Sequence, residues 1–314
     1  MGRFILRRLG FVLVSMLAAS VILFLILRVL PGDITAVILG MFATKEAMAN
    51  LRVELGLDHP LIVQYFSWLA GFVTGDWGTS VVMSAPILDL VMERLGRSLV
   101  LAGIALALYA PIGILLGTIA ATRRNTWVDH SISIGALSFV GLPEFVTGLV
   151  LIYVFALQLQ WLPAQSGGDF ASGFSLDVRM LILPAITVSL TMIAYITRMT
   201  RSSTVEVLQA DYVRTAYLKG LPRGKVMRTH VLRNSLLPTV TVIGNSMGWL
   251  VGGLVVTETV FGYPGLGRLL VFAIQRRDLP LVMDVVMLIV VVVGIANLMA
   301  DVIYAWLNPR IAYK

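Results

Sequence analysis

The chain has 314 residues, of which 58% are hydrophobic and only 13% are charged, and its mean hydropathy is +0.90. Soluble domains carry about 25% charged residues, so this composition argues against a water-soluble fold. The formal net charge of +7 could suggest nucleic acid as a partner. The basic residues, however, lie in short connections between apolar runs and form no basic domain, so we expect no nucleic-acid binding.

Residue types that carry metal or redox chemistry are scarce. The chain has no cysteine, which rules out disulfides and thiolate metal sites. His59, His130 and His230 lie far apart in the sequence, without the spacing typical of metal ligands. We therefore expect no metal site and no cofactor in this chain.

Six runs are apolar and long enough to cross a bilayer as helices, which takes about 20 residues. The first run follows Arg7 and Arg8 and exceeds the apolar part of a signal peptide, which is about 7 to 15 residues, so we expect a retained anchor. The sequence predicts an all-α integral membrane protein with about six transmembrane helices. The predicted spans are residues 9–30, 98–122, 132–158, 180–197, 236–257 and 281–307.

The distribution of positive charge predicts the orientation of these spans. With the amino terminus inside, the cytoplasmic segments are the amino-terminal tail, residues 123–131, residues 198–235 and the carboxyl terminus. These segments hold 15 of the 24 Lys and Arg residues and only three of the 17 acidic ones. Cytoplasmic loops carry such an excess of positive charge, so both termini are predicted to be cytoplasmic.

The predicted spans divide the chain into three regions. Residues 1–30 form the anchor helix, residues 31–97 lie outside the membrane, and residues 98–314 form a five-helix core with a cytoplasmic loop at 198–235. In the outer region, Thr44 is a candidate N-cap for a short helix that ends at Gly56. An apolar helix is expected at 61–73, followed by a tight turn at 75–80.

Small residues recur every fourth position in two of the spans. Gly113 and Gly117 lie in the second, and Gly244, Gly248 and Gly252 lie in the fifth. This spacing lets helix backbones approach closely, so the fifth helix is predicted to be buried.

Polar residues inside the spans are candidates for the translocation path. A carboxylate at membrane depth costs about 3 kcal/mol, so Glu144 is expected to face the bundle interior or a wet cavity. It could pair with a solute amine or a cation, or it could accept hydrogen bonds freed by a kink at Pro143. Asn245 in the fifth span is the second candidate. Asp284 and Asp301 lie near span ends and are expected at the membrane interface.

The loop at 198–235 is the longest polar stretch on the predicted cytoplasmic side. Four apolar residues at helical spacing predict one amphipathic helix, which Gly220 ends with a left-handed cap before Pro222. Such a helix could dock a partner, or it could lie in the lipid headgroups. The apolar residues are Val205, Leu208, Tyr212 and Ala216.

The segments 211–222 and 230–238 of this loop resemble the EAA loop of ABC importer permeases, in the form found in the dipeptide, oligopeptide and nickel branch. In that family the loop forms a coupling helix that sits in a groove of the ATPase subunit. Arg214 and Thr215 stand where the general motif has Glu and Ala. The resemblance implies that the ATPase contacts are made by Tyr212, Arg214, Thr215, Ala216, Lys219, Gly220, Leu221 and Pro222.

The resemblance extends over nearly the whole chain, because further short strings match in order and spacing. It implies the type I ABC importer permease fold and a B-type permease subunit of the bacterial cytoplasmic membrane. The matching strings are residues 7–9, 30–33, 55–61, 64–65, 75–80, 261–267, 301, 304 and 308–310.

The same resemblance implies the partners. They are a second homologous permease of the C type, two ATP-binding subunits that hold ATP and Mg²⁺, and a periplasmic or lipid-anchored solute-binding protein, besides membrane lipid. This chain itself has no phosphate-binding Gly-rich motif, nucleophile elbow or zinc motif, so we expect a transport subunit and not an enzyme.

The sequence does not identify the solute. Members of the branch import dipeptides and oligopeptides, nickel complexes, glutathione, opines or short sugars, and peptide is the default. The alternative class is an ion-coupled secondary transporter, which would need paired carboxylates near the membrane midplane. A membrane-embedded enzyme would need clustered His, Asp or Ser at that depth, and none is visible.

Overall fold

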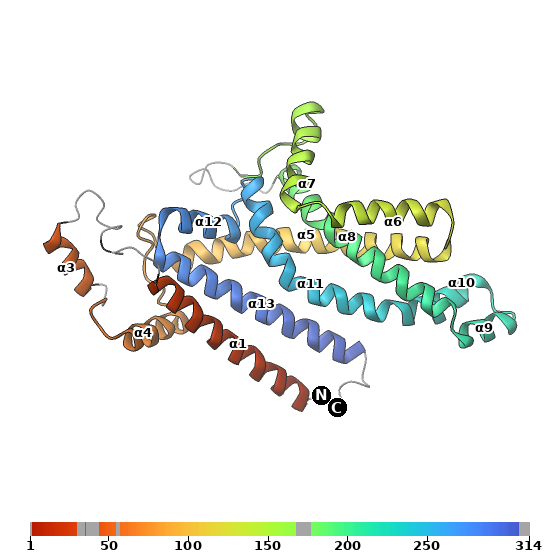
Figure 1. The fold of residues 1–314 in the computed structure, drawn as a ribbon, viewed down its shortest axis with the longest axis horizontal. Helices are drawn as coiled ribbons and strands as arrows, with labels where there is room; N and C mark the ends of the chain where they lie inside the picture. The colour runs from red at the N-terminus through yellow and green to blue at the C-terminus, as the bar shows by residue number, and fades with distance from the viewer. Residues whose placement is uncertain (1, 30–34, 36–43, 55–56, 168–176, 308–314) are drawn as a thin grey trace.

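The structure is a computed structural model that describes residues 2–29, 35, 44–54, 57–167 and 177–307. Within these ranges the regular elements are helices, and the one β-type contact is an isolated bridge between Thr79 and Pro86. Figure 1 shows the helices as an elongated bundle. In chain order they are α1 (Gly2–Val29), α3 (Lys45–Glu54), α4 (Leu61–Thr74), α5 (Ile87–Thr122), α6 (Trp127–Val140), α7 (Glu144–Leu151), the π-helix η2 (Ile152–Gln158), α8 (Val178–Leu208), α9 (Asp211–Leu218), α10 (Arg223–Val226), the π-helix η3 (Met227–Leu232), α11 (Arg233–Val260), α12 (Leu266–Arg276) and α13 (Leu279–Leu307).

The all-α membrane architecture predicted from the sequence is confirmed. Within the described ranges, α1, α5, α8 and α13 are each long and apolar enough to cross a membrane, and α6 with α7 and η2 makes a fifth candidate if that bent pair is one span. The predicted fifth span forms most of α11, a helix of 28 residues. Both α5 and α8 extend beyond their predicted spans, because hydropathy marks the membrane-embedded part of a helix and not the ends set by Pro86 and Gln209.

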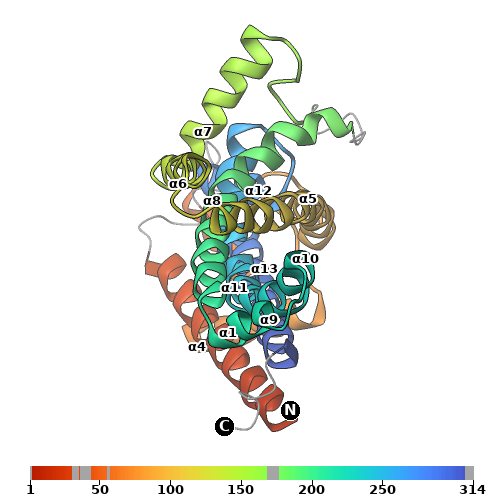
Figure 2. The same ribbon diagram turned by 90° about the vertical axis from the view of Figure 1, so that its right-hand side faces the viewer.

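The third predicted span is not a straight helix. α6 ends at Val140 and α7 begins at Glu144, and the two helices are bent by 106° at this break. Pro143 is the N-cap of α7, with an extended ψ of 139°. Proline disfavours helical geometry in the residue before it, which explains a break at this point. Figures 1 and 2 show α7 projecting away from the bundle.

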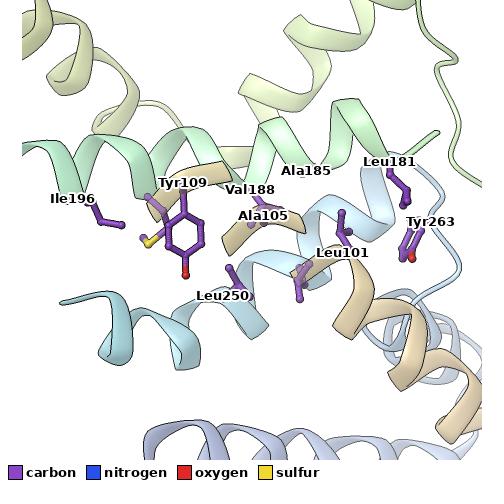
Figure 3. Close-up of a cluster of buried hydrophobic side chains, with 11 residues drawn as sticks. Leu101, Ala105, Tyr109, Leu181, Ala185, Val188, Ile196, Leu250 and Tyr263 are labelled. Atoms are coloured by element: carbon purple, nitrogen blue, oxygen red, sulfur yellow. The ribbon is translucent and has the colours of Figure 1, made fainter. Parts of the chain in front are cut away.

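The core lies where α5 and α8 cross α11. Figure 3 shows this cluster, in which Tyr109 of α5 lies beside Leu250 of α11 and its hydroxyl is 3.3 Å from the hydroxyl of Ser246. α5 and α8 approach closely because α5 presents glycines. A Cβ on Gly113 would lie 2.6 Å from the Ile196 side chain, and one on Gly117 would lie 2.6 Å from the Thr197 carbonyl oxygen. The close packing predicted for this glycine pair is therefore confirmed.

The three glycines of α11 differ in how closely neighbouring side chains pack against them. A Cβ on Gly244 would meet Ala300 of α13 at 2.8 Å, and one on Gly248 would meet Asn297 and Val293 at 3.5 Å. A Cβ on Gly252 would have no neighbour within 4 Å. Asn245 is exposed while Leu250 and Leu254 are buried, so the burial expected of the fifth helix holds for part of its surface only.

α1 runs along α13, and their contact joins the two ends of the chain (Figure 1). Arg8 forms an ion pair of 2.9 Å with Asp301, and a Cβ on Gly294 would lie 2.5 Å from Met16. Most of α1 is exposed apolar surface, as expected of a helix that faces lipid.

The short helices of the outer region form where the sequence predicts them. The Thr44 hydroxyl accepts a hydrogen bond of 3.1 Å from the Ala47 amide at the start of α3. α4 covers 61–74 and ends at Gly75, which has a φ of 86°. The proposed stop at Gly56 and the predicted motif residues at 30–33 and 308–310 lie outside the described residues.

Candidate functional site

The stretch from Val205 to Lys219 does not form the single amphipathic helix predicted from the sequence, whereas the predicted break at Gly220 and the further helix after it are present. α8 continues to Leu208, and α9 starts at Asp211 after Ala210, whose ψ of 141° is extended. Val205 and Leu208 therefore belong to α8, while Tyr212 and Ala216 belong to α9. The apolar residues on the two sides of the break keep helical spacing by coincidence, and no Gly or Pro at the break signals the end of a helix.

One face of α9 is packed inside the loop. Val213 is fully buried and Ala216 is 6% exposed, and both belong to one apolar cluster with Val226 and Val231 of the returning segment. Leu221 is partly buried against the same cluster. Because Ala216 and Leu221 face inward, they hold α9 in place and present little surface to a partner.

The opposite face of α9 is open. Tyr212 is 47% exposed, Tyr217 is 39% exposed and Leu218 is 81% exposed. Arg214, Thr215 and Lys219 are also exposed. Tyr217 and Leu218 were not among the predicted contact residues, although a Tyr-Leu pair in an otherwise polar loop was a visible signal.

A left-handed turn closes α9. Gly220 has a φ of 77°, and its amide donates to the Tyr217 carbonyl at 2.9 Å. The Leu221 amide donates to the Ala216 carbonyl at 3.3 Å, and Pro222 is the N-cap of α10. The predicted cap is thus confirmed, and it reverses the chain within a few residues.

Polar contacts join α9 to the long helices. The Asn234 amide nitrogen donates to the Tyr212 hydroxyl at 3.2 Å. Where α8 meets α11, the Thr204 hydroxyl donates to Ser235 at 3.2 Å, and the hydroxyls of Thr200 and Thr239 are 3.1 Å apart. The base of the loop is therefore held by paired hydroxyls in addition to apolar packing.

An ion pair connects this base to α6. The Asp129 carboxylate is 1% exposed and receives two hydrogen bonds from Arg201, at 2.5 Å from Nε and 2.7 Å from Nη2. The Asn125 amide donates to the same carboxylate at 3.0 Å. Such two-pronged contact fixes both partners, so α6 and α8 move together near the loop.

The two candidates for the translocation path are not brought together. Glu144 begins α7, where its carboxylate accepts a hydrogen bond from the Thr257 hydroxyl and lies against Gly253 of α11. Asn245 is exposed on α11 eight residues before Gly253, about 12 Å along the helix.

The acidic residues of α13 differ from each other. Asp301 pairs with Arg8, whereas Asp284 is 2% exposed and accepts a hydrogen bond from Trp68, so it is buried against α4. The expected position of both residues at the membrane interface stays a prediction. Sequence analysis also missed Glu258, which is fully buried and accepts from the amides of Gly267 and Arg268 at the start of α12. A carboxylate at the end of an apolar run, followed by closely spaced glycines, was its only signal.

The described residues thus form a bundle of helices suited to a membrane, with a packed polar loop at one end, the architecture of a multi-pass membrane protein. Comparison with known families agrees. A model of the binding-protein-dependent transport system inner membrane component matches residues 113–313, and a model of the N-terminal part of such components matches residues 1–102. The chain belongs to this family, and it is a permease subunit of an ABC importer in the inner membrane, where ATP hydrolysis is the task of separate subunits.

Individual relatives match over the full length. A probable peptide ABC transporter permease protein of Sinorhizobium fredii is 41% identical, and the match covers 100% of each chain. The glutathione transport system permease protein of Escherichia coli is 36% identical, again over 100% of each. Among solved structures, an amino acid ABC transporter matches 71% of this chain and 94% of its own, at 17% identity and a TM-score of 0.49, which is too weak a likeness to carry an argument.

Proposed function

We propose that this permease imports peptides or a related small solute, and that α9 is the helix through which a partner ATPase drives it. The names of full-length relatives, which mention peptide and glutathione transport, support the solute class. Nothing in the comparisons favours the ion-coupled alternative. Both termini and α9 would lie in the cytoplasm, as the positive-charge distribution predicts.

The observation that carries the proposal is that one face of α9 is buried and the opposite face is exposed. Its inner face is sealed by Val213 and Ala216, yet Leu218 leaves 81% of its surface open at the tip of the molecule. Burying a Leu side chain contributes about 1.5–3 kcal/mol, so an apolar groove on a partner would bind this tip. Figures 1 and 2 show α9 and α10 together at one end of the bundle.

The charges around this tip indicate the chemistry of the groove. Arg214 and Lys219 are both exposed beside Leu218. We infer that the ATPase groove combines an apolar pocket with carboxylates at its rim. Rim charges of this kind guide association more than they add affinity.

The connections of α9 explain how a movement of the ATPase would reach the membrane. The packed inner face of α9, the paired hydroxyls between α8 and α11 and the Asp129–Arg201 ion pair form a continuous set of contacts. Packed helices shift as bodies in such transitions, so displacement of α9 would move α8 and α11 together.

We propose that Asn245 lines the path of the solute through the membrane. Glu144, in contrast, is proposed to join α7 to α11. An exposed amide in the middle of a membrane helix faces a polar cavity or another subunit more readily than lipid. Glu144 instead uses its carboxylate to tie α7 to α11 through Thr257, as a hydrogen-bond acceptor at a proline break can.

We further propose the assembly implied by the family: a second, C-type permease, two ATP-binding subunits with ATP and Mg²⁺, and a periplasmic or lipid-anchored solute-binding protein.

The test of the docking role of α9 is co-purification of the ATP-binding subunits with tagged permease. Leu218→Ala removes about 2 kcal/mol of apolar burial and should lower the recovered ATPase by 10-fold or more. Leu218→Met keeps the volume and should retain it. Full recovery with Leu218→Ala would refute the docking role of α9.

A further inference from the structure

A cavity of about 730 Å³ lies between α1, α4 and α13, remote from the loop that carries the proposed function. It is at the end of the α1–α13 pair opposite the contact of Arg8 with Asp301. Its wall combines apolar and aromatic side chains with a few acceptors. The wall residues that matter here are Gln64, Trp68, Phe72, Asp76, Trp77 and Asp284.

The carboxylate of Asp284 is buried in this wall, and no described Lys, Arg or His, including His59 of the same wall, forms an ion pair with it. Its Oδ1 accepts one hydrogen bond of 2.9 Å from the Trp68 indole, and Oδ2 receives none from any described residue. Asp76 supplies a second carboxylate, and the described wall contains no Lys or Arg. Burying an unpaired carboxylate costs free energy. A positively charged ligand would therefore stabilise this site.

Gln64 adds a second acceptor whose orientation is fixed. Its amide nitrogen donates to the carbonyls of Leu57 at 3.1 Å and His59 at 2.7 Å. This arrangement identifies the other amide atom as Oε1, which is buried and has no hydrogen-bond partner in the described structure. An unsatisfied buried acceptor costs free energy, and no described wall residue, Ser67 and His59 included, donates to Gln64 Oε1.

Aromatic faces complete the wall. The rings of Phe72 and Trp77 are stacked with centroids 4.8 Å apart, and Trp68 lies 6.3 Å from Phe72. Aromatic faces attract cations, and their attraction adds to that of a nearby carboxylate.

We propose that this cavity binds a primary ammonium group. Such a group has three N–H donors and a positive charge, which match Asp284 Oδ2, Gln64 Oε1 and the aromatic faces. The headgroup of phosphatidylethanolamine and the free amine of a peptide both carry this chemistry. α4 exposes Leu61, Ile62 and Phe66 beside the cavity, which suits the acyl chains of a lipid.

The test is native mass spectrometry of the complete, detergent-purified transporter after delipidation. Phosphatidylethanolamine, phosphatidylcholine and phosphatidylglycerol with identical acyl chains are added separately, and the dipeptide Ala-Ala forms a fourth arm. We expect preferential retention of the ethanolamine lipid, because the choline headgroup has no N–H donor. Asp284→Asn should weaken that retention about 10- to 100-fold. The exposed Asp89→Asn, which lies outside this wall, should leave it unchanged.

Two further variants separate binding from damage to the fold. Trp68→Phe keeps an aromatic face and removes the indole donor, so the Asp284 carboxylate should bind ammonium as well or better. Gln64→Leu removes Oε1 and should weaken retention several-fold even if Asp284→Asn does not purify as a single species. Asp284-dependent binding of Ala-Ala in place of the lipid would keep the ammonium site and assign it to peptide. Equal retention of the three lipids without Ala-Ala binding, or binding unchanged in Asp284→Asn and Gln64→Leu, would overturn the proposal.

Discussion

Gly220 has a backbone φ of 77°, and no atom would lie within 4 Å of a Cβ built on it. Space is therefore no obstacle to a side chain there, and the requirement for glycine comes from the backbone alone. L-residues pay roughly 1–2 kcal/mol for this conformation, and β-branched residues are the least tolerant. The left-handed turn that ends α9 thus depends on this residue.

Replacing this residue gives the first prediction. Gly220→Val should tilt α9 and abolish solute uptake by whole cells, while the amount of permease in the membrane stays normal. Gly220→Asn is the matched control, because Asn adopts left-handed geometry more readily, and it should retain much of the uptake. Normal uptake by Gly220→Val would contradict the role of this turn.

Gly117 is required for the opposite reason, because the space beside it is filled. A Cβ there would lie 2.6 Å from the Thr197 carbonyl oxygen and from the Thr200 side chain. Gly117→Ala should push α5 from α8 and lower the free energy of unfolding by about 1–3 kcal/mol, seen as a lower melting temperature in detergent. Gly103→Ala, on the same helix with no neighbour within 4 Å, should be neutral or stabilising.

At the scale of elements, the join between α6 and α8 depends on polar contact as well as packing. Asp129 sits in the first turn of α6 and is buried, whereas Arg201 is on α8 with its side chain 32% exposed. The pair lies near the base of the loop. Its contribution is that of a positioning contact, and its loss should leave α6 free to move relative to α8.

A double-mutant cycle tests this join. Asp129→Asn and Arg201→Gln should each lower the free energy of unfolding by about 1–3 kcal/mol, because each leaves a polar partner unsatisfied. The double variant should lose less than the sum, since the two residues interact directly. Arg198→Gln, an exposed position on α8, serves as the control for lost charge. Strictly additive losses would show that the pair contributes nothing to the join.

For the whole molecule, the structure places the loop with α9 at one end and the turn after α4 towards the other (Figure 1). The proposed orientation puts these ends on opposite sides of the membrane. The absence of cysteine makes the test simple, since any introduced thiol is unique.

We expect a membrane-impermeant maleimide to label Thr79→Cys in cells whose outer membrane has been permeabilised. Lys219→Cys should be labelled only after the inner membrane is disrupted. Both positions are exposed in this chain, and the use of cells that lack the ATP-binding subunits keeps the proposed docking partner from covering Lys219. Labelling of Lys219→Cys in cells with an intact inner membrane would reverse the proposed orientation.

Much of the architecture follows from local sequence signals. Apolar length predicted the membrane helices, Thr44 and Gly220 predicted a helix start and a helix end, and the Gly113–Gly117 spacing predicted a close crossing. These features depend on neighbouring residues along the chain, and hydropathy, capping and backbone sterics act over that range. The family resemblance of the loop also rested on contiguous residues, and family membership was confirmed.

Only the tertiary structure decided which side chains are left without a partner. The break before α9, the inward face of Ala216, the burial of Asp284 and the network of Glu258 all depend on residues distant in sequence. Periodicity gives the face of one helix, but it does not say which other helix covers that face or how far the chain bends at Pro143. The sequence by itself thus determined an all-helical membrane permease with a polar loop at 198–235, whose coupling role stays a prediction. Packing between distant segments decided the shape of that loop and the carboxylate-lined cavity at the far end, because burial and hydrogen-bond pairing are properties of assembled elements.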